Sequence, residues 1–202
     1  MIPVLPTSYF GSIAYFQELA KHKEVLIEAK EYFPKQTYRN RCDILGGDGI
    51  LSLSIPVKKP AGSKTKTDEV LLSNEENWRM RHWRSFTSAY QASPYFDHYR
   101  MEIRELLFNE EDSILKFNTT ITKRIIDWLD LKTKLTMTNE FQTPLENDLR
   151  EILVAKGAHQ KEEKATYIQV FQGKKYFRKS LSVLDAILCN GPMARNLIMI
   201  EH

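Results

Sequence analysis

The opening of the chain most constrains its fold, because it alternates between a strand, a helix and a second strand. Ile2 to Leu5 is a short apolar run, interrupted by Pro3, that predicts a buried strand. Thr7 or Ser8 is then expected to cap a helix, whose apolar face would carry Ile13, Phe16, Leu19 and Ala20. Val25 to Ala29 predicts the second strand. A strand, a helix and a strand in this order are typical of an α/β fold.

A glycine-rich turn, Gly46-Gly47-Asp48-Gly49, separates two apolar runs, Arg39 to Leu45 and Ile50 to Val57. This arrangement predicts a β-hairpin whose second strand buries Leu51, Leu53 and Ile55. The turn has no strand-to-helix context, so it does not indicate a phosphate-binding loop. Lys58 to Asp68 follows and is the best candidate for a mobile loop.

Helices dominate the middle of the sequence. A capping box over Ser73 to Glu76 predicts the start of a long helix, with one apolar stripe formed by Trp78, His82, Phe86 and Tyr90. Pro94 separates this helix from a second one, whose buried face would carry Tyr99, Ile103, Leu106 and Leu107. A third helix is expected from about Asp112, with Ile114, Phe117, Ile121, Ile125 and Trp128 facing inward.

The last third of the chain predicts further alternation. Lys134 to Thr138 is expected to be a strand, and Thr143 to cap a helix that ends near Gly157. A polar loop to Lys164 precedes a strand over Ala165 to Phe171, and a short helix over Leu181 to Cys189 follows. Together these elements predict an α/β fold of one domain over residues 1–202, with a mixed, partly parallel sheet, a β-hairpin and helices on both faces.

Bulk composition excludes several classes of protein. The chain has 202 residues, 42% of them hydrophobic, which suits one domain with a substantial core. Its two cysteines do not suggest a secreted, disulfide-rich domain. No signal sequence precedes the first strand, and no apolar stretch approaches the ~20 residues that span a bilayer. We therefore expect a cytoplasmic protein without membrane insertion.

The net charge of +3 suits an anionic small molecule as well as RNA. Nucleic acid is the weaker expectation, because nucleic-acid binders usually concentrate more charge on one face. The five histidines lack metal-ligand spacing, so no metal is predicted, and no cofactor is implied. No nucleophile elbow is present, and Cys42 and Cys189 are expected to be structural thiols.

The richest cluster of basic residues is Tyr38-Arg39-Asn40-Arg41, with Lys58 at the far end of the hairpin. Side chains alternate along a strand, so Arg39 and Arg41 would share one face and could grip a phosphate or carboxylate. The alternative is a solvated strand face with surface ion pairs. The Thr7-Ser8-Tyr9 turn is a second candidate anion site, because it follows a strand and is expected to open a helix.

His82 lies within the apolar stripe of its helix. It is either a hydrogen-bonded core residue or a general base, because histidine titrates near neutral pH. Arg79, Arg81 and Arg84 flank it and could extend a positive patch. Asp185 lies on the same helical side as two leucines, and would either pair with a cation across a pocket or lie exposed at the edge of the helix. Trp78 is either core or a stacking platform.

Several ordered motifs resemble the WbqC-like protein family. They are Leu5-Pro6-Thr7-Ser8-Tyr9-Phe10 with Tyr15-Phe16, Asn40-Arg41 with Ile55-Pro56-Val57-Lys58, Trp78-Arg79-x-x-His82 with Ala89-Tyr90 and Pro94-Tyr95-Phe96, and Leu181-Ser182-x-x-Asp185 with Asn190-Gly191. Two positions depart from the family's pattern. Gly11 stands where many members have proline, and Ser180 stands where they have asparagine. The resemblance covers nearly the whole chain.

The resemblance implies a role in bacterial surface-polysaccharide, lipopolysaccharide or O-antigen, biosynthesis. One hypothesis is a transferase that moves an acyl or aminoacyl group to an amino sugar carried on a nucleotide. His82 and Asp185 would be catalytic, and the substrate, a nucleotide sugar or sugar phosphate, would be bound by Ser8, Tyr9, Arg39, Asn40, Arg41, Lys58, Trp78 and Tyr90. The other hypothesis is a non-catalytic ligand-binding or scaffold protein of the same pathway. A homodimer is compatible with either.

Overall fold

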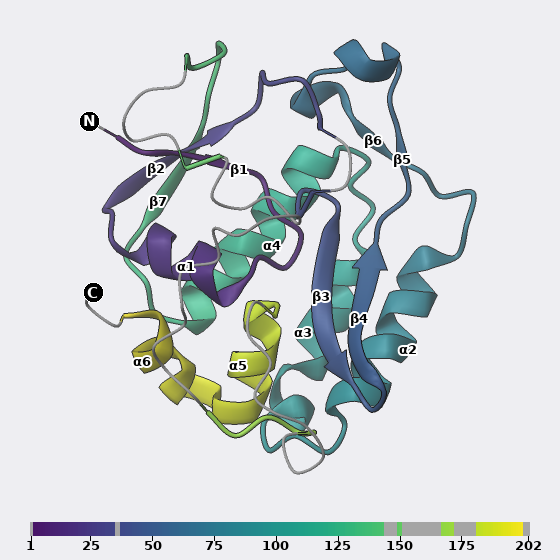
Figure 1. Cartoon of the computed structure of the whole chain (residues 1–202), viewed down its shortest axis with the longest axis vertical. Coiled ribbons are helices and arrows are strands. Elements are labelled where there is room, and N and C mark those ends of the chain that lie inside the picture. Colours follow the sequence, from purple (N-terminus) through teal and green to yellow (C-terminus); the bar gives the residue numbers. More distant parts are fainter. Residues whose placement is uncertain (1, 35–36, 144–148, 151–166, 172–180, 200–202) are drawn as a thin grey trace.

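The structure, a computed structural model, describes residues 2–34, 37–143, 149–150, 167–171 and 181–199 (Figure 1). A parallel sheet contains three strands in the order β1 (Val4–Pro6), β2 (Glu24–Glu28) and β7 (Lys134–Met137). α1 (Ile13–Ala20) connects β1 to β2. The predicted strand-helix-strand opening and the later strand at β7 are confirmed, and the chain has an α/β fold with parallel and antiparallel strands.

The start of α1 differs from the prediction. The helix begins at Ile13, and its N-cap is Ser12, whose side-chain oxygen accepts a hydrogen bond from the Tyr15 amide at 3.2 Å. Phe10, with a φ of 40°, and Gly11 turn the chain between β1 and the helix. Thr7 and Ser8 therefore lie in the turn after β1 and cap no helix.

The hairpin is confirmed. β3 (Arg41–Gly46) and β4 (Gly49–Ser54) pair antiparallel, and Gly46 lies opposite Gly49, so Gly47 and Asp48 form the connection. Leu53 and Ile55 are buried as predicted, whereas Leu51 is 42% exposed because it lies near the tip of the hairpin. The hairpin forms a sheet separate from the parallel one, as does the short pair β5 (Val57–Lys58) and β6 (Leu71–Leu72).

The three central helices are α2 (Trp78–Tyr90), α3 (Phe96–Phe108) and α4 (Ile114–Trp128). Their predicted apolar faces are buried, apart from a partly exposed Trp128, and the stripe from Trp78 to Tyr90 is buried throughout. In Figure 1 the parallel sheet lies at the upper left and the hairpin with α2 at the right.

The predicted capping box over Ser73 to Glu76 is wrong. α2 begins after Asn77, which makes no side-chain cap hydrogen bond. The Ser73 amide instead donates to the carbonyl of Pro56 at 2.9 Å. Ser73 thus continues the β5–β6 pairing, and tertiary backbone bonding overrides the local capping signal.

The segment from Lys58 to Asp68 is a loop, as predicted, but it is docked on the chain that follows β2. It contains the 3-10 turns η1 (Gly62–Lys64) and η2 (Thr67–Glu69), and Thr65 is fully buried. The Thr65 carbonyl accepts a hydrogen bond from the Phe33 amide at 2.9 Å. This docking places the loop beside the carboxyl end of the parallel sheet.

The C-terminal helices are α5 (Val183–Asn190) and α6 (Ala194–Ile198), with the 3-10 turn η4 (Gly191–Met193) between them. α5 agrees with the predicted helix over Leu181 to Cys189. Three backbone hydrogen bonds dock its start on the rest of the fold: Ile13 amide to Leu181 carbonyl at 3.2 Å, Ser182 amide to Asp43 carbonyl at 2.8 Å, and Val183 amide to Gly11 carbonyl at 2.9 Å.

Other predicted elements fall largely outside the described residues. The helix expected from Thr143 to near Gly157 and the loop to Lys164 lie there almost entirely. Of the strand predicted over Ala165 to Phe171, residues 167–171 are described, and they form no strand. Tyr167 and Gln169 instead turn their side chains inward, where both are buried.

Candidate functional site

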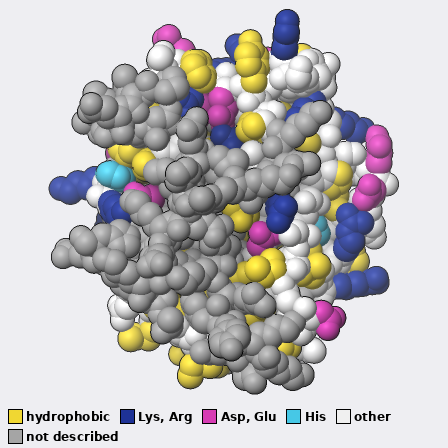
Figure 2. All heavy atoms as spheres, viewed as in Figure 1, with side chains coloured by type: hydrophobic (Ala, Val, Ile, Leu, Met, Phe, Trp, Pro, Cys, Tyr) yellow, Lys and Arg dark blue, Asp and Glu magenta, His cyan; other side chains and the backbone are white. Residues whose placement is uncertain are grey.

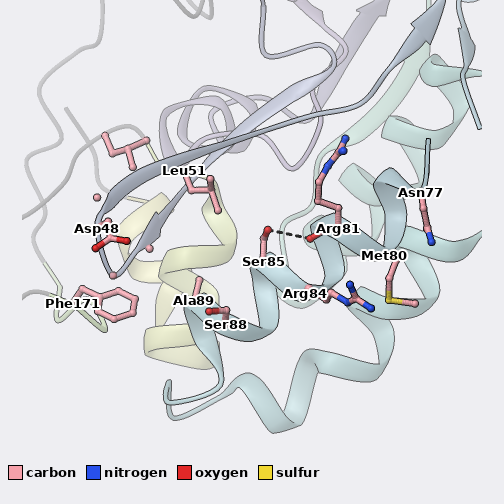
Figure 3. A pocket seen from close by; sticks show the side chains of 14 residues that line it. Asp48, Leu51, Asn77, Met80, Arg81, Arg84, Ser85, Ser88, Ala89 and Phe171 are labelled. Atoms are coloured by element: carbon pink, nitrogen blue, oxygen red, sulfur yellow. Dashed lines mark hydrogen bonds between the residues drawn. The ribbon is translucent and has the colours of Figure 1, made fainter. Parts of the chain in front are cut away.

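A groove of about 930 Å³ separates the tip of the β3–β4 hairpin from the outer face of α2 (Figure 3). The hairpin contributes the glycine-rich turn with Ile50 and Leu51, and Phe171 lies at its tip. α2 contributes a polar row comprising Asn77, Arg81, Arg84, Ser85 and Ser88, together with Met80 and Ala89. The groove therefore combines a cationic, hydroxyl-bearing wall with an apolar one.

The cationic wall comes from the side of α2 opposite its buried stripe. Arg81 and Ser85 extend from α2 toward the hairpin, and Arg84 lies on the outward side of the helix (Figure 3). Arg81 Nη2 lies 3.1 Å from Glu76 Oε2 in an exposed ion pair. Among the described residues, no ion pair engages Arg84. Exposed pairs of this kind are weak, so both guanidinium groups are able to bind an anion.

The opposite wall offers apolar surface. Ile50 is 51% exposed and Leu51 is 42% exposed, although both are large hydrophobic residues in a regular strand. Figure 2 shows Lys and Arg side chains along the edge of the molecule where α2 lies, interspersed with Asp and Glu. An anionic ligand with a less polar portion suits these two walls.

His82 lies on the other side of α2 and does not reach the groove. Its Nδ1 is 2.8 Å from the hydroxyl of Tyr9, and the backbone of Ser54 lies near the ring. The side chain is 1% exposed, and burial lowers its pKa to about 4. The ring is therefore neutral near pH 7, and its Nδ1 shares a hydrogen bond with the Tyr9 hydroxyl. Of the two roles expected for His82, the structure shows the hydrogen-bonded core residue.

Asp185 belongs to a different buried cluster. Its Oδ2 accepts hydrogen bonds from the Tyr167 hydroxyl at 2.6 Å and from Gln169 Nε2 at 3.1 Å. The Tyr90 hydroxyl approaches the carboxylate without completing a hydrogen bond of normal geometry. Burial raises the pKa of Asp185, although these donors partly oppose the shift.

The two predicted catalytic residues are not partners. Asp185 meets α2 at Tyr90, which lies eight residues beyond His82 on the same helix. At about 1.5 Å of rise per residue, that separation is roughly 12 Å. Asp185 does not orient the imidazole, since its carboxylate bonds Tyr167 and Gln169, whereas His82 bonds Tyr9.

The predicted anion grip is also not assembled. Arg39 is 4% exposed and forms a two-pronged ion pair with Glu31, with Nε to Oε1 at 2.8 Å and Nη2 to Oε2 at 2.9 Å. Arg41 instead bonds Asp43, with Nε to Oδ1 at 3.0 Å. Arg39 precedes β3, so strand alternation does not place the two guanidinium groups on one face.

Lys58 is exposed and pairs with Glu75, with Nζ to Oε1 at 2.7 Å. Ser8 Oγ donates to the Tyr38 carbonyl at 3.4 Å, and Asn40 Nδ2 donates to the Ile55 carbonyl at 2.9 Å. Both polar groups brace the hairpin against its neighbours. Tyr9, Trp78 and Tyr90 are fully buried, so none of them is a stacking platform at the surface.

The residues that line the groove carry only a weak signal in the sequence. Arg81 and Arg84 stand out in the sequence only as arginines flanking His82, and Ser85 and Ser88 do not stand out. The usable signal is their spacing, because residues three and four apart share one helical face. That face is complementary to the apolar stripe and points across to the glycine-rich turn.

Within the described part of the chain, no group of three or more His, Cys, Asp or Glu side chains is placed to hold a metal ion. None of the described helices is both long enough and apolar enough to cross a membrane. The polar groups that line the groove are guanidinium, hydroxyl, amide and carboxylate groups.

Comparison with known proteins adds a family. A model of the WbqC-like protein family matches residues 7–180. The chain is 23% identical over 135 residues to the uncharacterized protein Rv1507c of Mycobacterium tuberculosis, a match that covers 66% of this chain and 58% of the relative. The chain thus spans little more than half of that relative's length. No solved structure shows a significant match.

Proposed function

The chain belongs to the WbqC-like protein family, and from this premise we propose that it binds an anionic, nucleotide-sugar-like molecule in the groove between the hairpin and α2. Its place would be bacterial surface-polysaccharide, or O-antigen, biosynthesis in the cytoplasm. The family resemblance supports the proposed pathway, and the residues that line the groove support the proposed binding site.

One observation carries the proposal: Arg81 and Arg84, three residues apart on α2, line the same groove as a glycine-rich turn. One guanidinium group can donate hydrogen bonds to two phosphate oxygens at once, which makes arginine well suited to a diphosphate. The hydroxyls of Ser85 and Ser88 add donors for sugar oxygens. A volume of about 930 Å³ lies within the usual range for small-molecule sites.

The apolar wall of the groove favours a ligand that carries a less polar group in addition to its phosphates. Ile50, Leu51 and Phe171 line the groove near the hairpin tip. A base or the carbon face of a sugar ring would cover this surface while its phosphates meet the arginines. Nucleotide sugars combine both kinds of surface in one molecule.

Group transfer is the finer proposal, with an acyl or aminoacyl group moving to an amino sugar. It would require a base at the groove, and His82 does not supply one, because its ring is buried in the core, where it bonds Tyr9. Asp185 is likewise buried. The separation of these two residues favours the alternative, a non-catalytic ligand-binding or scaffold protein of the same pathway.

A thermal-shift screen of the purified chain against nucleotide sugars, nucleoside diphosphates and sugar phosphates tests the proposal. A ligand at one hundred times its Kd adds about 2.7 kcal/mol to the free energy of unfolding. We expect Arg81→Ala and Arg84→Ala each to reduce the shift. Arg100→Ala is the matched control, because Arg100 is an exposed helix arginine paired with Asp97 away from the groove.

Loss of the shift in the two groove variants, with the Arg100 variant unchanged, supports the groove as the site. Two results argue against it: no compound in the screen raises the melting temperature, or the groove variants respond like the unaltered protein. Formation of an acylated or aminoacylated amino sugar from the bound sugar and an activated acyl donor, with release of the donor's carrier group, would favour the transferase over the binding protein.

A further inference from the structure

A second pocket, of about 470 Å³, opens beyond the carboxyl ends of β2 and β7. Its lining comprises Lys30, Tyr32, Lys66, Asn139, Glu140 and Phe141. β2 and β7 are parallel neighbours, so the segments that follow them emerge at the same edge of the sheet (Figure 1). In open α/β sheets this edge is where ligands bind. None of these six residues contributes to the groove.

Two aromatic rings are held exposed at this pocket. Tyr32 is 62% exposed and Phe141 is 51% exposed, and they come from different strand ends. An isolated β-bridge to Lys66 fixes the backbone of Tyr32. The guanidinium of Arg150 lies 5.0 Å from the ring centre of Phe141. Rings supported in this way present their free surface to a ligand at little conformational cost.

A single buried carboxylate organises both walls. Glu28 is fully buried, and its Oε1 accepts from the Lys30 amide at 2.7 Å and from Thr138 Oγ1 at 2.9 Å. Its Oε2 accepts from the Gln142 amide at 3.0 Å and from Arg150 Nη1 at 3.1 Å. The segments after β2 and β7 are thus tied to one side chain, and the pocket between them is pre-formed.

The charges at the pocket limit the kind of ligand. Lys30 is paired with Asp68 at 2.5 Å, whereas Lys66 is exposed at the opening. Glu140 on the opposite side disfavours a polyanion, because it would repel a second charged group. One anionic group beside the lysines, and a neutral ring with hydrogen-bonding edges beside Asn139, satisfy all of these features.

We propose that this pocket is a second binding site, which takes a nucleoside monophosphate. The base stacks on Tyr32 and Phe141, Asn139 bonds its edge, and Lys66 meets the phosphate. The site is separate from the groove, and it stands whether or not the groove binds a nucleotide sugar.

Calorimetric titration of the full chain with adenosine 5′-monophosphate tests the proposal. Adenosine lacks the phosphate and ribose 5-phosphate lacks the base, so each is expected to bind at least about tenfold more weakly. Tyr32→Ala and Phe141→Ala are each expected to weaken binding of the monophosphate about tenfold, the range found for stacking of a base on an aromatic side chain. Lys66→Ala should weaken the monophosphate but leave adenosine unchanged.

Lys64→Ala is the control, because Lys64 is exposed in the same loop but does not line the pocket. A double variant, Arg81→Ala with Arg84→Ala, separates this site from the groove and should retain the monophosphate. The proposal is overturned if the monophosphate does not bind, if the Tyr32 and Phe141 variants bind it normally, or if the groove double variant abolishes binding. Circular dichroism of each variant shows whether a loss of binding reflects a loss of fold.

Discussion

The hydroxyl of Tyr9 lies 2.8 Å from Nδ1 of His82, and this contact joins the turn after β1 to the buried face of α2. The ring of His82 also lies 5.2 Å from the ring of Trp78. The Ser54 backbone of β4 also lies near the ring, so the imidazole lies where three parts of the fold meet. Its structural role has consequences that can be measured.

Stability should fall on acidification. Burial depresses the pKa of His82 to about 4 from 6.5, so between these values the unfolded chain binds a proton that the folded chain does not. The stabilisation is complete above pH 6.5 and is lost as the pH falls toward 4, by roughly 3 kcal/mol in all. Urea unfolding at pH 7.5 and pH 5 should show a smaller loss for His82→Gln than for the unaltered protein.

The control for this titration is His98→Gln, because His98 is exposed on α3. That variant should follow the pH dependence of the unaltered chain. Equal pH dependence in the His82 variant and the parent would show that the buried imidazole is not the group that titrates.

Glu28→Gln should destabilise the fold strongly. The side chain of Glu28 is fully buried and that of Arg150 is 7% exposed, and the substitution removes the carboxylate charge of this buried ion pair. Breaking one partner of a buried pair costs about 3–5 kcal/mol. Chemical unfolding measures the change. Glu24→Gln, at the partly exposed start of the same strand, should cost far less. Similar losses in both variants would contradict the clamp role of Glu28.

Gly11→Ala should also destabilise the chain. A Cβ at this position would lie 2.7 Å from Cδ1 of Tyr15 and 3.3 Å from the ring of Phe16, and both rings are buried. Overpacking of this kind costs about 1–3 kcal/mol. Gly47→Ala serves as the comparison, since its nearest neighbour would be Phe171 at 3.8 Å. A melting temperature unchanged by Gly11→Ala would mean that the Tyr15 ring moves aside without cost.

Asp185→Asn should leave ligand binding at the groove intact. Asp185 bonds Tyr167 and Gln169 in the interior, and burial already raises its pKa, so a neutral amide is tolerated. Titration of any ligand found in the screen should give an unchanged Kd for this variant, with any loss confined to stability. A large rise in Kd with an unchanged melting temperature would restore Asp185 as a binding residue.

The helices and parallel strands could be predicted because their signals are periodic and repeated. The stripe from Trp78 to Tyr90 and the face of α4 each combine several apolar positions, and burial of these faces confirms them. Helix caps could not be predicted equally well. Ser73 has the local pattern of an N-cap, but its amide bonds Pro56, which lies far away in the sequence.

The candidate site was harder to predict because ion pairs form through the tertiary fold. Arg39 is bound by Glu31, which follows β2, and Lys58 is bound by Glu75, so neither contributes to the groove. Arg81 and Arg84 become notable only when the hairpin tip is placed opposite them. Residue type and spacing indicated a basic protein with an anion site, but the position of that site depends on packing between distant segments.

The docking of α5 has a consequence for how the chain is made. Gly11 meets Val183, and β2 meets β7, so the first strands are completed by residues synthesised much later. Contacts of such long sequence separation slow folding. On the ribosome, the apolar surfaces of β1, α1 and β2 wait for the C-terminal segment before they can be covered. Until α5 has been synthesised, these surfaces stay exposed in the nascent chain, and aggregation competes with folding.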